Sequence, residues 1–480
     1  MAADRMLQFV GHDQSYPDKR SPEERARDFR EIAERYAAPD ARDQSARCSQ
    51  CGVPYCSVHC PLHNHIPEWL RLTAEGRLRE AYELSNATST MPEICGRICP
   101  QDRLCEGNCV IESAGHGAVT IGSVEKYITD TAWAEGWVEP VRAGPATGQS
   151  VGIVGAGPAG LTAAEYLRVA GHEVHVYDRH DRAGGLLTYG IPGFKLEKEV
   201  VMRRIERLAE SGIHFHAGFE VGRDATLNAL RQRHDAVLIA TGVYKAREIA
   251  VPGKDAEGVV AALDYLIASN RKGFGDAVPA FDDGRLNAEG KHVVVIGGGD
   301  TAMDCVRTAV RQGAKSVKCL YRRDRENMPG SQREVANAEE EGVEFVWLAA
   351  PERFTADKAV RQVAAQGMRL GAPDASGRRN PEPDPGRSFD LPADMVIKAL
   401  GFDPEELPHL FGAPDLSVTR WGTLRVDHQT MMTSLPGVFA AGDIVRGASL
   451  VVWGIRDGRD VSEQIAKWLK VKAKTEKKAA

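Results

Sequence analysis

Ser-Val-Gly-Ile-Val-Gly-Ala-Gly-Pro-Ala-Gly, residues 150–160, is the stretch that decides the fold. Its apolar start is typical of a short buried strand, and the GxGxxG pattern then predicts a tight turn that opens a helix. The first glycine permits the turn, the second lets a dinucleotide pyrophosphate approach the backbone, and the third lets helix and strand pack closely. The helix N-terminus would present its positive end to the phosphates. The candidate binding residues of this turn are Gly155, Ala156, Gly157, Pro158, Ala159 and Gly160.

The sequence that follows supports a dinucleotide site. A second strand, residues 173–177, ends in Asp178, whose carboxylate would hold the hydroxyl pair of a ribose. A Gly-Gly pair at 184–185, a strand ending in Ala-Thr-Gly at 236–242 and a Val-Phe-Ala-Ala-Gly-Asp stretch at 438–443 complete the pattern. Together these features resemble the glutathione-reductase-like superfamily, which implies FAD here; an NAD site or a degenerate Rossmann unit is the alternative. The further candidate FAD-binding residues are Asp178, Arg179, Gly185, Leu186, Ala240, Thr241, Gly242, Gly442 and Asp443.

A second unit of the same kind begins with the strand at 291–296 and its glycine turn. The next strand, residues 316–321, ends in Arg322 and Arg323 instead of an acid. Two guanidinium groups suit the dianionic 2′-phosphate of NADPH, whereas an acid would suit a free 2′-hydroxyl. The alternative is that these arginines form surface salt bridges with Asp324 or Glu326. The candidate NADPH-binding residues are Gly297, Gly298, Gly299, Asp300, Thr301, Ala302, Arg322 and Arg323.

Eight of the ten cysteines lie between positions 48 and 109, in two closely spaced groups. Thiolates are the usual protein ligands of iron–sulfur clusters, and eight suffice for two 4Fe-4S clusters. Zinc is the alternative, but its common CxxC spacing fits only Cys48 and Cys51. A flavin in the same chain needs a one-electron acceptor, which favours iron–sulfur chemistry. The candidate metal ligands are Cys48, Cys51, Cys56, Cys60, Cys95, Cys99, Cys105 and Cys109.

Cys305 and Cys319 follow the second glycine turn, and we interpret them as small buried hydrophobic residues. No closely spaced cysteine pair accompanies the predicted flavin site, which argues against a disulfide reductase. Hydride transfer between positioned cofactors needs no catalytic acid or nucleophile, so we assign none.

The length of 480 residues predicts two to four domains. The fold class is α/β, with two Rossmann-like dinucleotide-binding domains preceded by a mainly α-helical iron–sulfur domain. Within the latter, the stretches 21–36 and 66–84 look helical. The predicted divisions are 1–147 for the iron–sulfur domain, 148–245 for the first part of the FAD-binding domain, 246–403 for the NADPH-binding domain, and 404–480 for the second part of the FAD-binding domain with the C-terminal tail.

Composition excludes several classes of partner. The formal net charge is −6, so no excess of positive charge favours nucleic acid. No apolar stretch reaches the roughly 18–20 residues that cross a bilayer, and no signal-peptide core follows the first residues. We therefore expect a cytoplasmic protein without nucleic-acid or membrane partners.

Five segments resemble the family of glutamate synthase small subunits: 50–56, 94–109, 189–194, 328–334 and 447–453. The resemblance implies a chain that passes electrons from NADPH through FAD and two 4Fe-4S clusters to a large partner subunit, which forms glutamate from glutamine and 2-oxoglutarate. Other proteins share this domain organisation, so the alternatives are an NADPH:ferredoxin oxidoreductase or the electron-input chain of a pyrimidine reductase. A zinc-stabilised nucleotide sensor is the non-enzymatic alternative.

The similar cysteine domain of dihydropyrimidine dehydrogenase implies a division of the ligands. By that resemblance Cys48, Cys51, Cys56 and Cys109 would hold one cluster. Cys60, Cys99 and Cys105 would hold the other, completed by Cys95 or by a side chain near Glu125.

Overall fold

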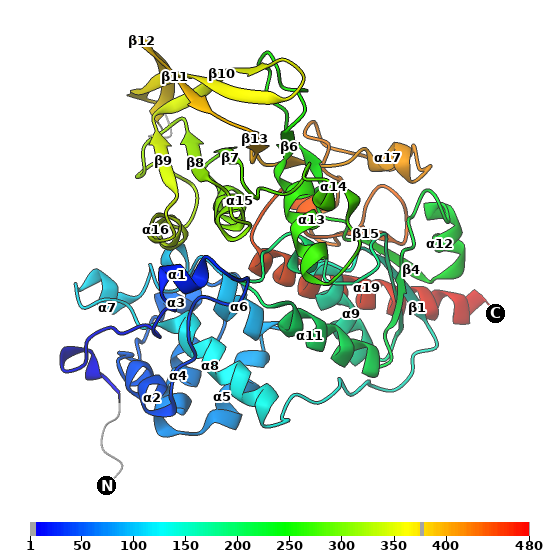
Figure 1. Ribbon diagram of the computed structural model, residues 1–480. Helices are drawn as coiled ribbons and strands as arrows, with labels where there is room; N and C mark the ends of the chain where they lie inside the picture. Colours follow the sequence, from blue (N-terminus) through cyan, green and yellow to red (C-terminus); the bar gives the residue numbers. More distant parts are fainter. Residues whose placement is uncertain (1–5, 375–378, 480) are drawn as a thin grey trace.

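The computed structural model describes residues 6–374 and 379–479, in three bodies (Figure 1). A helical N-terminal body packs beside two units, each built on a five-stranded parallel sheet. The first sheet has the order β15-β4-β1-β2-β3. Its strands are β1 (Ser150–Val154), β2 (Glu173–Asp178), β3 (His214–Ala217), β4 (Ala236–Ile239) and β15 (Val438–Ala440). β15 returns from near the C-terminus to pair with β4, so the chain leaves this unit and comes back to it.

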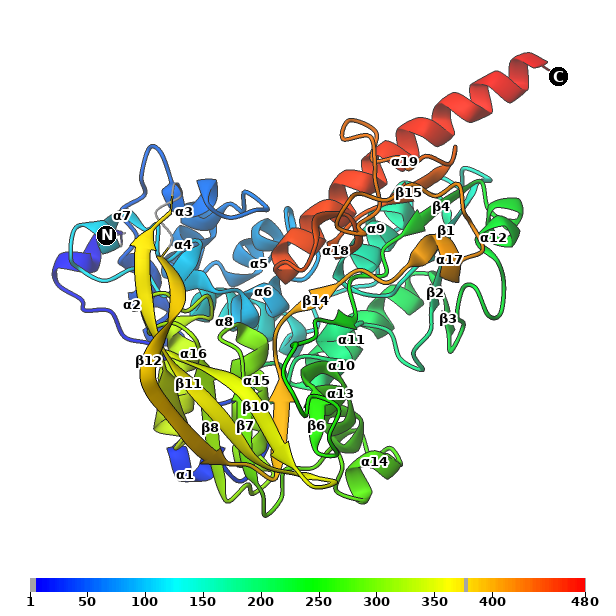
Figure 2. The same cartoon turned by 90° about the horizontal axis from the view of Figure 1, so that it is seen from above.

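Helices cover both faces of the first sheet because its central strands are buried on both sides. These helices are α9 (Pro158–Val169), α10 (Leu186–Tyr189), α11 (Lys198–Glu210), α12 (Leu227–Arg233), α17 (Leu407–Leu410), α18 (Asp443–Arg446) and α19 (Val451–Ala479). α19 lies along α9 and runs on towards the C-terminus (Figure 2). A Cβ atom at Gly458 of α19 would stand 2.3 Å from the carbonyl oxygen of Ala159, so only glycine allows this close approach.

Gly458→Ala should therefore destabilise the fold. The added methyl group meets α9 backbone, which cannot give way as a flexible side chain does, and overpacking of this kind costs about 1–3 kcal/mol. Gly273→Ala is the matched control, because Gly273 also lies in a helix and its Cβ would meet nothing within 4 Å. Thermal unfolding should show a lower Tm for Gly458→Ala and an unchanged or higher Tm for the control. Equal Tm values for both variants would refute the close contact.

The second sheet repeats the design, with the order β6-β13-β7-β8-β9. Its strands are β6 (Val259–Ala261), β7 (His292–Ile296), β8 (Ser316–Tyr321), β9 (Glu344–Trp347) and β13 (Met395–Lys398), and its helices are α13 (Ala262–Gly273), α14 (Pro279–Asp282), α15 (Asp300–Arg311) and α16 (Gln332–Glu340). A short antiparallel pair, β5 (Lys245–Ala246) with β14 (Phe402–Asp403), joins the two units where the chain enters and leaves the second.

A three-stranded antiparallel sheet covers one face of the second unit (Figure 2). It consists of β10 (Ala349–Ala356), β11 (Val360–Pro373) and β12 (Arg379–Pro392). Val363 and Leu391 pack in one apolar cluster with Val294 and Val396 of the parallel sheet. This extra sheet thus takes the place that a helix layer would otherwise fill, and nothing in the sequence analysis predicted it.

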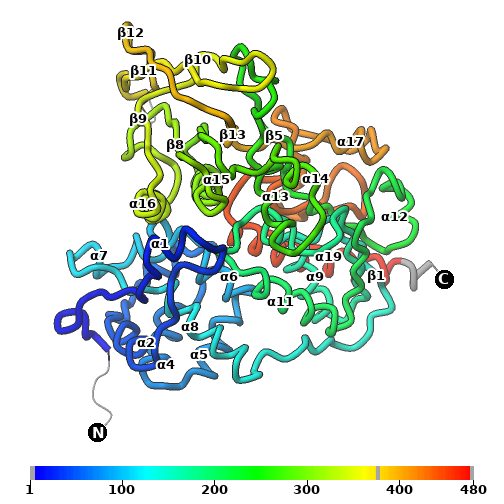
Figure 3. The backbone as a smooth tube through the Cα atoms, viewed as in Figure 1, coloured from blue at the N-terminus to red at the C-terminus, as the bar shows by residue number. Residues whose placement is uncertain are grey.

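The N-terminal body is helical, as expected (Figure 3). Its elements are η1 (Gln8–Val10), α1 (Pro22–Arg25), α2 (Ala38–Ala46), α3 (Tyr55–Val58), α4 (Ile66–Glu75), α5 (Leu78–Asn86), α6 (Pro92–Ile98), η2 (Gln101–Arg103), α7 (Val110–Ser113) and α8 (Ile121–Ala134). The predicted helix over 66–84 is two helices, because Gly76 takes a left-handed conformation at φ 79° and ends α4.

The prediction of a helix over residues 21–36 is wrong, because only Pro22–Arg25 is helical. Tertiary contacts override the local pattern here. Arg25 is buried and pairs with Glu340 of α16 at 2.6 Å, while the backbone N–H of Ile32 donates to the carbonyl of Phe194. The segment therefore binds both Rossmann units instead of continuing as a helix. Over the described residues, no helix combines the length and the apolar character that crossing a bilayer requires.

Candidate functional site

The glycine turn of the first unit is built as its pattern predicts. Gly155 has φ 107°, and a Cβ there would lie 2.4 Å from the carbonyl oxygen of Ala240, so this glycine sits against the turn that leaves β4. A Cβ at Gly160 would lie 2.0 Å from the carbonyl oxygen of Gly155, which makes the third glycine a packing requirement. Gly157 instead faces open space, with nothing within 4 Å of its Cβ position. The backbone at Gly157 is thus accessible where a pyrophosphate would approach.

The predicted FAD-binding residues converge on one pocket. Six segments meet there: the start of α9, the end of β2, the Gly-Gly loop, the exits of β4 and β15, and the start of α19. The lining residues are Gly155, Gly157, Pro158, Ala159, Asp178, Gly185, Leu186, Ala240, Thr241, Gly242, Tyr244, Gly442, Asp443, Ser449, Leu450, Val451 and Gly454. Of the predicted FAD-binding residues, Ala156, Gly160 and Arg179 do not line this pocket. The backbone N–H of Ala156 donates to Asp178 at 2.7 Å, and that of His180 donates to the other carboxylate oxygen at 2.8 Å. Asp178 is therefore oriented before any ligand arrives.

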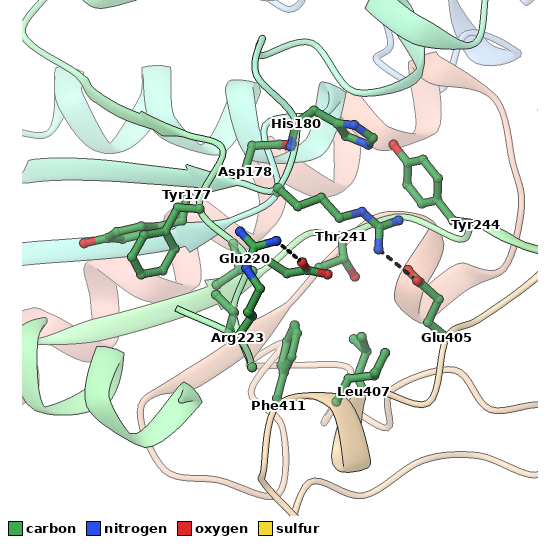
Figure 4. A pocket seen from close by; sticks show the side chains of 17 residues that line it. Tyr177, Asp178, His180, Glu220, Arg223, Thr241, Tyr244, Glu405, Leu407 and Phe411 are labelled. Atoms are coloured by element: carbon green, nitrogen blue, oxygen red, sulfur yellow. Dashed lines mark hydrogen bonds and ion pairs between the residues drawn. The ribbon is translucent and has the colours of Figure 1, made fainter. Parts of the chain in front are cut away.

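A second pocket continues the first, since both are lined by Gly155, Asp178, Thr241 and Tyr244. Figure 4 shows this second pocket, with Tyr244 and Glu405 on one side of it. The Arg179 guanidinium lies 4.6 Å from the centre of the Tyr244 ring and pairs with Glu405 at 2.8 Å. The two pockets together form a long groove over the carboxyl ends of the strands, the shape that an extended dinucleotide needs.

Several lining residues of this groove escaped the sequence analysis. Tyr244, Glu405, Leu407 and Phe411 belong to no recognisable motif. They come from the segments that link the two units: Tyr244 directly precedes β5, and the other three follow β14, where the chain returns. The nearest sequence signal was the Ala-Thr-Gly turn, which ends two residues before Tyr244.

The second glycine turn follows the same rules. Gly297 sits against the carbonyl oxygen of Ala399, 2.2 Å from where its Cβ would be, just as Gly155 sits against Ala240. Gly298 lies under the ring of Tyr321, and Gly299 faces open space. Asp300, the next residue, accepts a hydrogen bond from the backbone N–H of Ser331 at 2.9 Å, which fastens the segment before α16 over the turn.

Arg322 and Arg323 both follow β8, but their surroundings differ. Arg322 is exposed, whereas Arg323 is 6% exposed and its Nε atom is buried without a hydrogen-bond partner. Within the described residues neither arginine forms an ion pair, and Asp324 instead accepts from the amide of Asn327 at 2.6 Å. The salt bridges considered as an alternative are thus absent from the described chain. An unpaired buried guanidinium nitrogen is costly and suits an anionic ligand.

The eight clustered cysteines divide into two groups of four in space. Burial raises the pKa of Cys48 to about 11, and the nearby thiols of Cys109 and Cys51 add to the effect. Burial likewise raises the pKa of Cys56 to about 12, with Cys48 and Cys109 contributing. Cys109 thus lies beside three cysteines that precede it by more than fifty positions. Closely grouped thiols in a buried site can ionise when they bind cationic iron, so this group fits a 4Fe-4S cluster.

The second group lines a small pocket of its own. Cys60, Cys95, Cys99 and Cys105 all face it, together with Glu125. Burial, followed by the charge of Glu93, raises the pKa of Glu125 to about 8, although Asn64 donates to its carboxylate at 3.1 Å. Four thiols suffice for a cluster here without Glu125. The structure therefore brings together both residues proposed as the fourth ligand, Cys95 and Glu125.

The first turn of α19 separates this cysteine pocket from the predicted flavin pocket. Val452 lines the cysteine pocket, while its neighbour Val451 lines the flavin pocket. Arg456 and Arg459, one and two turns on, donate to the carbonyl oxygens of Pro61 and Leu62 at 3.3 Å. These bonds fasten the helix to the loop that follows Cys60. The two pockets are thus held on opposite sides of one helical turn.

Two family descriptions match the chain. Residues 25–137 match "dihydropyrimidine dehydrogenase domain II, 4Fe-4S cluster", and residues 149–458 match "pyridine nucleotide-disulphide oxidoreductase". A glutamate synthase [NADPH] small chain of Azospirillum brasilense is 66% identical over 98% of each chain. This chain belongs to the glutamate synthase small-chain family. The small chain of Escherichia coli K12 is 47% identical and covers 97% of this chain and 99% of its own length.

The likeness to a solved structure concerns the fold. Mycobacterium tuberculosis FprA in complex with NADPH superimposes with a TM-score of 0.58 at 20% identity, over 69% of this chain and 86% of that chain. The resemblance to glutamate synthase small subunits is thus confirmed, as is the fold class with its iron–sulfur part before the dinucleotide-binding units. As a member of this family, the chain is a pyridine-nucleotide oxidoreductase with a 4Fe-4S domain.

Cys305 and Cys319 are fully buried in the second unit, as predicted. Every described cysteine is free. A pair of cysteines beside the flavin pocket, which a disulfide reductase needs, does not occur among its lining residues. The family description "pyridine nucleotide-disulphide oxidoreductase" therefore applies to the fold.

Proposed function

We propose that this chain is the electron-input subunit of a glutamate synthase. It would oxidise NADPH and pass the electrons to a large subunit that forms L-glutamate from L-glutamine and 2-oxoglutarate. When bound, FAD would accept the electron pair of NADPH as hydride, and 4Fe-4S clusters would accept electrons singly. The observation that carries the proposal is the single turn of α19 between the flavin pocket and the second cysteine pocket.

The residues of this chain would bind and orient the two cofactors and shield them from solvent. Gly157 and Gly299 leave backbone open for pyrophosphate, and Asp178 is aimed at the ribose of FAD. Ser449 donates to Asp443 at 2.6 Å, and burial raises the pKa of Asp443, so that this carboxyl group is positioned at the flavin pocket. The N-terminus of α19 faces the same pocket, where its positive dipole end would favour negative charge on a bound group.

The two cysteine groups suggest a direction for electron flow. The group of Cys60, Cys95, Cys99 and Cys105 adjoins the flavin pocket and would hold the first acceptor. The group of Cys48, Cys51, Cys56 and Cys109 lines neither the flavin pocket nor the pocket of the first group, and its loop exposes Val53 and Tyr55 by 61% and 50%. We infer that electrons leave towards the large subunit from this second acceptor.

The predicted domain divisions become part of the proposal. Residues 1–147 would carry the clusters, 148–245 with 404–480 would bind FAD, and 246–403 would bind NADPH. The pairing of β15 with β4 supports assigning the C-terminal part to the FAD-binding unit. We also propose a cytoplasmic location, because a dense group of cysteines that bind clusters fits a reducing compartment, where disulfides are disfavoured.

The test compares the isolated chain with the chain mixed with its large subunit. Alone and loaded with its cofactors, the chain should oxidise NADPH with an artificial acceptor such as ferricyanide and form no glutamate from glutamine and 2-oxoglutarate. With the large subunit, NADPH oxidation should become dependent on both substrates and yield two glutamates for each glutamine and each NADPH consumed. Glutamate formation by the isolated chain would overturn the subunit assignment, and so would a large subunit that never gains NADPH-dependent activity from it.

A further inference from the structure

Four histidines gather on one face of the first sheet. None of them lines a pocket described above, although the ring of His216 stacks on that of Tyr177 of the second pocket at 4.5 Å between centroids. His175 lies on β2, His214 and His216 on β3, and His234 just after α12. Alternate residues of a strand share a face, and the register pairs His175 with His214. The His175 ring stacks on that of His214 at 4.7 Å and on that of His216 at 5.3 Å between centroids.

This cluster lies at the amino ends of the strands, opposite the dinucleotide groove. β2 begins at Glu173 and ends at Asp178, which lines the groove. Glu173, His175 and His214 line neither the flavin groove nor the cysteine pocket. The proposed electron transfer therefore leaves these residues unexplained.

Both ring nitrogens of His175 face another polar atom. Its Nδ1 lies 3.0 Å from Nε2 of His216, and its Nε2 lies 3.0 Å from Oε1 of Glu173. If His216 accepts the Nδ1 proton of His175, the Nε2 lone pair of His175 faces a carboxylate oxygen. Two acceptors at that distance need a proton or a cation between them.

We propose that Glu173, His175 and His214 form a binding site for a divalent transition-metal ion, Zn²⁺ in particular. The three side chains offer ligand atoms that all lie within 4.8 Å of one another. Two donors about 2 Å from a tetrahedral ion stand roughly 3.3 Å apart, so small side-chain rotations close the site around zinc. Two imidazoles and one carboxylate suit zinc, and water takes the fourth position.

The environment of the site fits this assignment. Glu173 and His214 are exposed and His175 is half-buried, so an ion can enter from solvent. His216 holds the ring nitrogen of His175 that points away from the ion, the usual arrangement for a metal-bound histidine. β3 is an edge strand of four residues, and the ion would tie it to β2. We infer that zinc strengthens the edge of the sheet and takes no part in electron transfer.

The experiment uses the full chain with its flavin and clusters in place, under anaerobic conditions, so that the eight clustered cysteines are occupied. Equilibrium dialysis against zinc chloride, with metal analysis, should find one zinc per chain in addition to the iron. His214→Gln and Glu173→Gln should each weaken zinc binding at least roughly tenfold, and His216→Gln should weaken it by about 10- to 100-fold while leaving the three ligands in place. His428→Gln, an exposed histidine outside the cluster, is the matched control.

Thermal unfolding gives a second readout. Zinc should raise the Tm of the wild type and of His428→Gln, because a ligand that binds only the folded state stabilises it. It should leave the Tm of His214→Gln unchanged. Zinc affinity that is the same in the ligand variants and the wild type would overturn the proposal, as would a cluster-loaded wild type that binds no stoichiometric zinc. NADPH oxidation should be equal in all these proteins.

Discussion

Cys99→Ser should abolish electron delivery to the large subunit while NADPH still reduces the flavin. Cys99 belongs to the cysteine group beside α19, across one helical turn from the flavin pocket. Loss of a partner that only supports a metal ligand typically costs 10- to 100-fold, so loss of a ligand itself should lower glutamate formation by roughly 100-fold or more. Stopped-flow reduction of the flavin by NADPH measures the first step. Steady-state glutamate formation measures electron delivery to the large subunit.

Cys51→Ser tests the order of the two acceptors. Cys51 belongs to the group proposed as the second acceptor, so this variant should still show NADPH-dependent reduction of the cluster beside α19 by paramagnetic resonance, yet deliver few electrons to the large subunit. In Cys99→Ser, neither cluster should be reduced by NADPH. Cys305→Ser is the matched control, because Cys305 is buried in the second unit far from either group. Unchanged iron content and turnover in Cys99→Ser would show that Cys99 is not a ligand.

Arg322→Ala combined with Arg323→Ala should raise KM for NADPH far more than for NADH. A hydrogen bond to a charged group contributes about 1.5–3 kcal/mol, so the loss of contacts to the 2′-phosphate should raise KM for NADPH by roughly 10- to 100-fold. NADH has no such phosphate, and its KM should stay nearly constant. Single variants should differ, since Arg322 is exposed and Arg323 is buried with an unpaired Nε.

The control for this experiment is Arg325→Ala. Arg325 is also exposed near the end of β8, but it pairs with Glu339 of α16 at 2.9 Å. Its loss should leave the preference for NADPH unchanged, because a surface ion pair contributes little. Equal changes in KM for NADPH and NADH in the double variant would remove the 2′-phosphate role from Arg322 and Arg323.

The glycine turns and strands could be predicted from sequence because local chemistry requires them. Gly155 and Gly297 each meet a carbonyl oxygen where any Cβ would clash, and β1, β7 and β8 are apolar runs that only a buried strand explains. The cysteine groups could be recognised as well, since eight thiols in about sixty positions have few other uses in a reducing compartment. These features depend on residues near one another in the chain.

Features that depend on distant contacts could not be predicted in this way. Arg25 looked like part of a helix, but it pairs with Glu340, which lies 315 positions away. Glu405 lines the flavin groove only because the chain returns through β14. The place of Val452 between two pockets depends on how α19 packs against both α9 and the cysteine loop. Such contacts form only when the three bodies pack together, and no local sequence pattern predicts them.

The most direct test of electron transfer from pyridine nucleotide to iron is the visible and paramagnetic-resonance spectrum of the anaerobically purified chain, recorded before and after NADPH is added. We expect a yellow-brown protein with flavin and two 4Fe-4S clusters per chain. NADPH should bleach the flavin band and produce the signal of a reduced cluster. A protein that contains zinc in place of iron and sulfide at the cysteines, or whose clusters stay oxidised when NADPH reduces the flavin, would contradict this account.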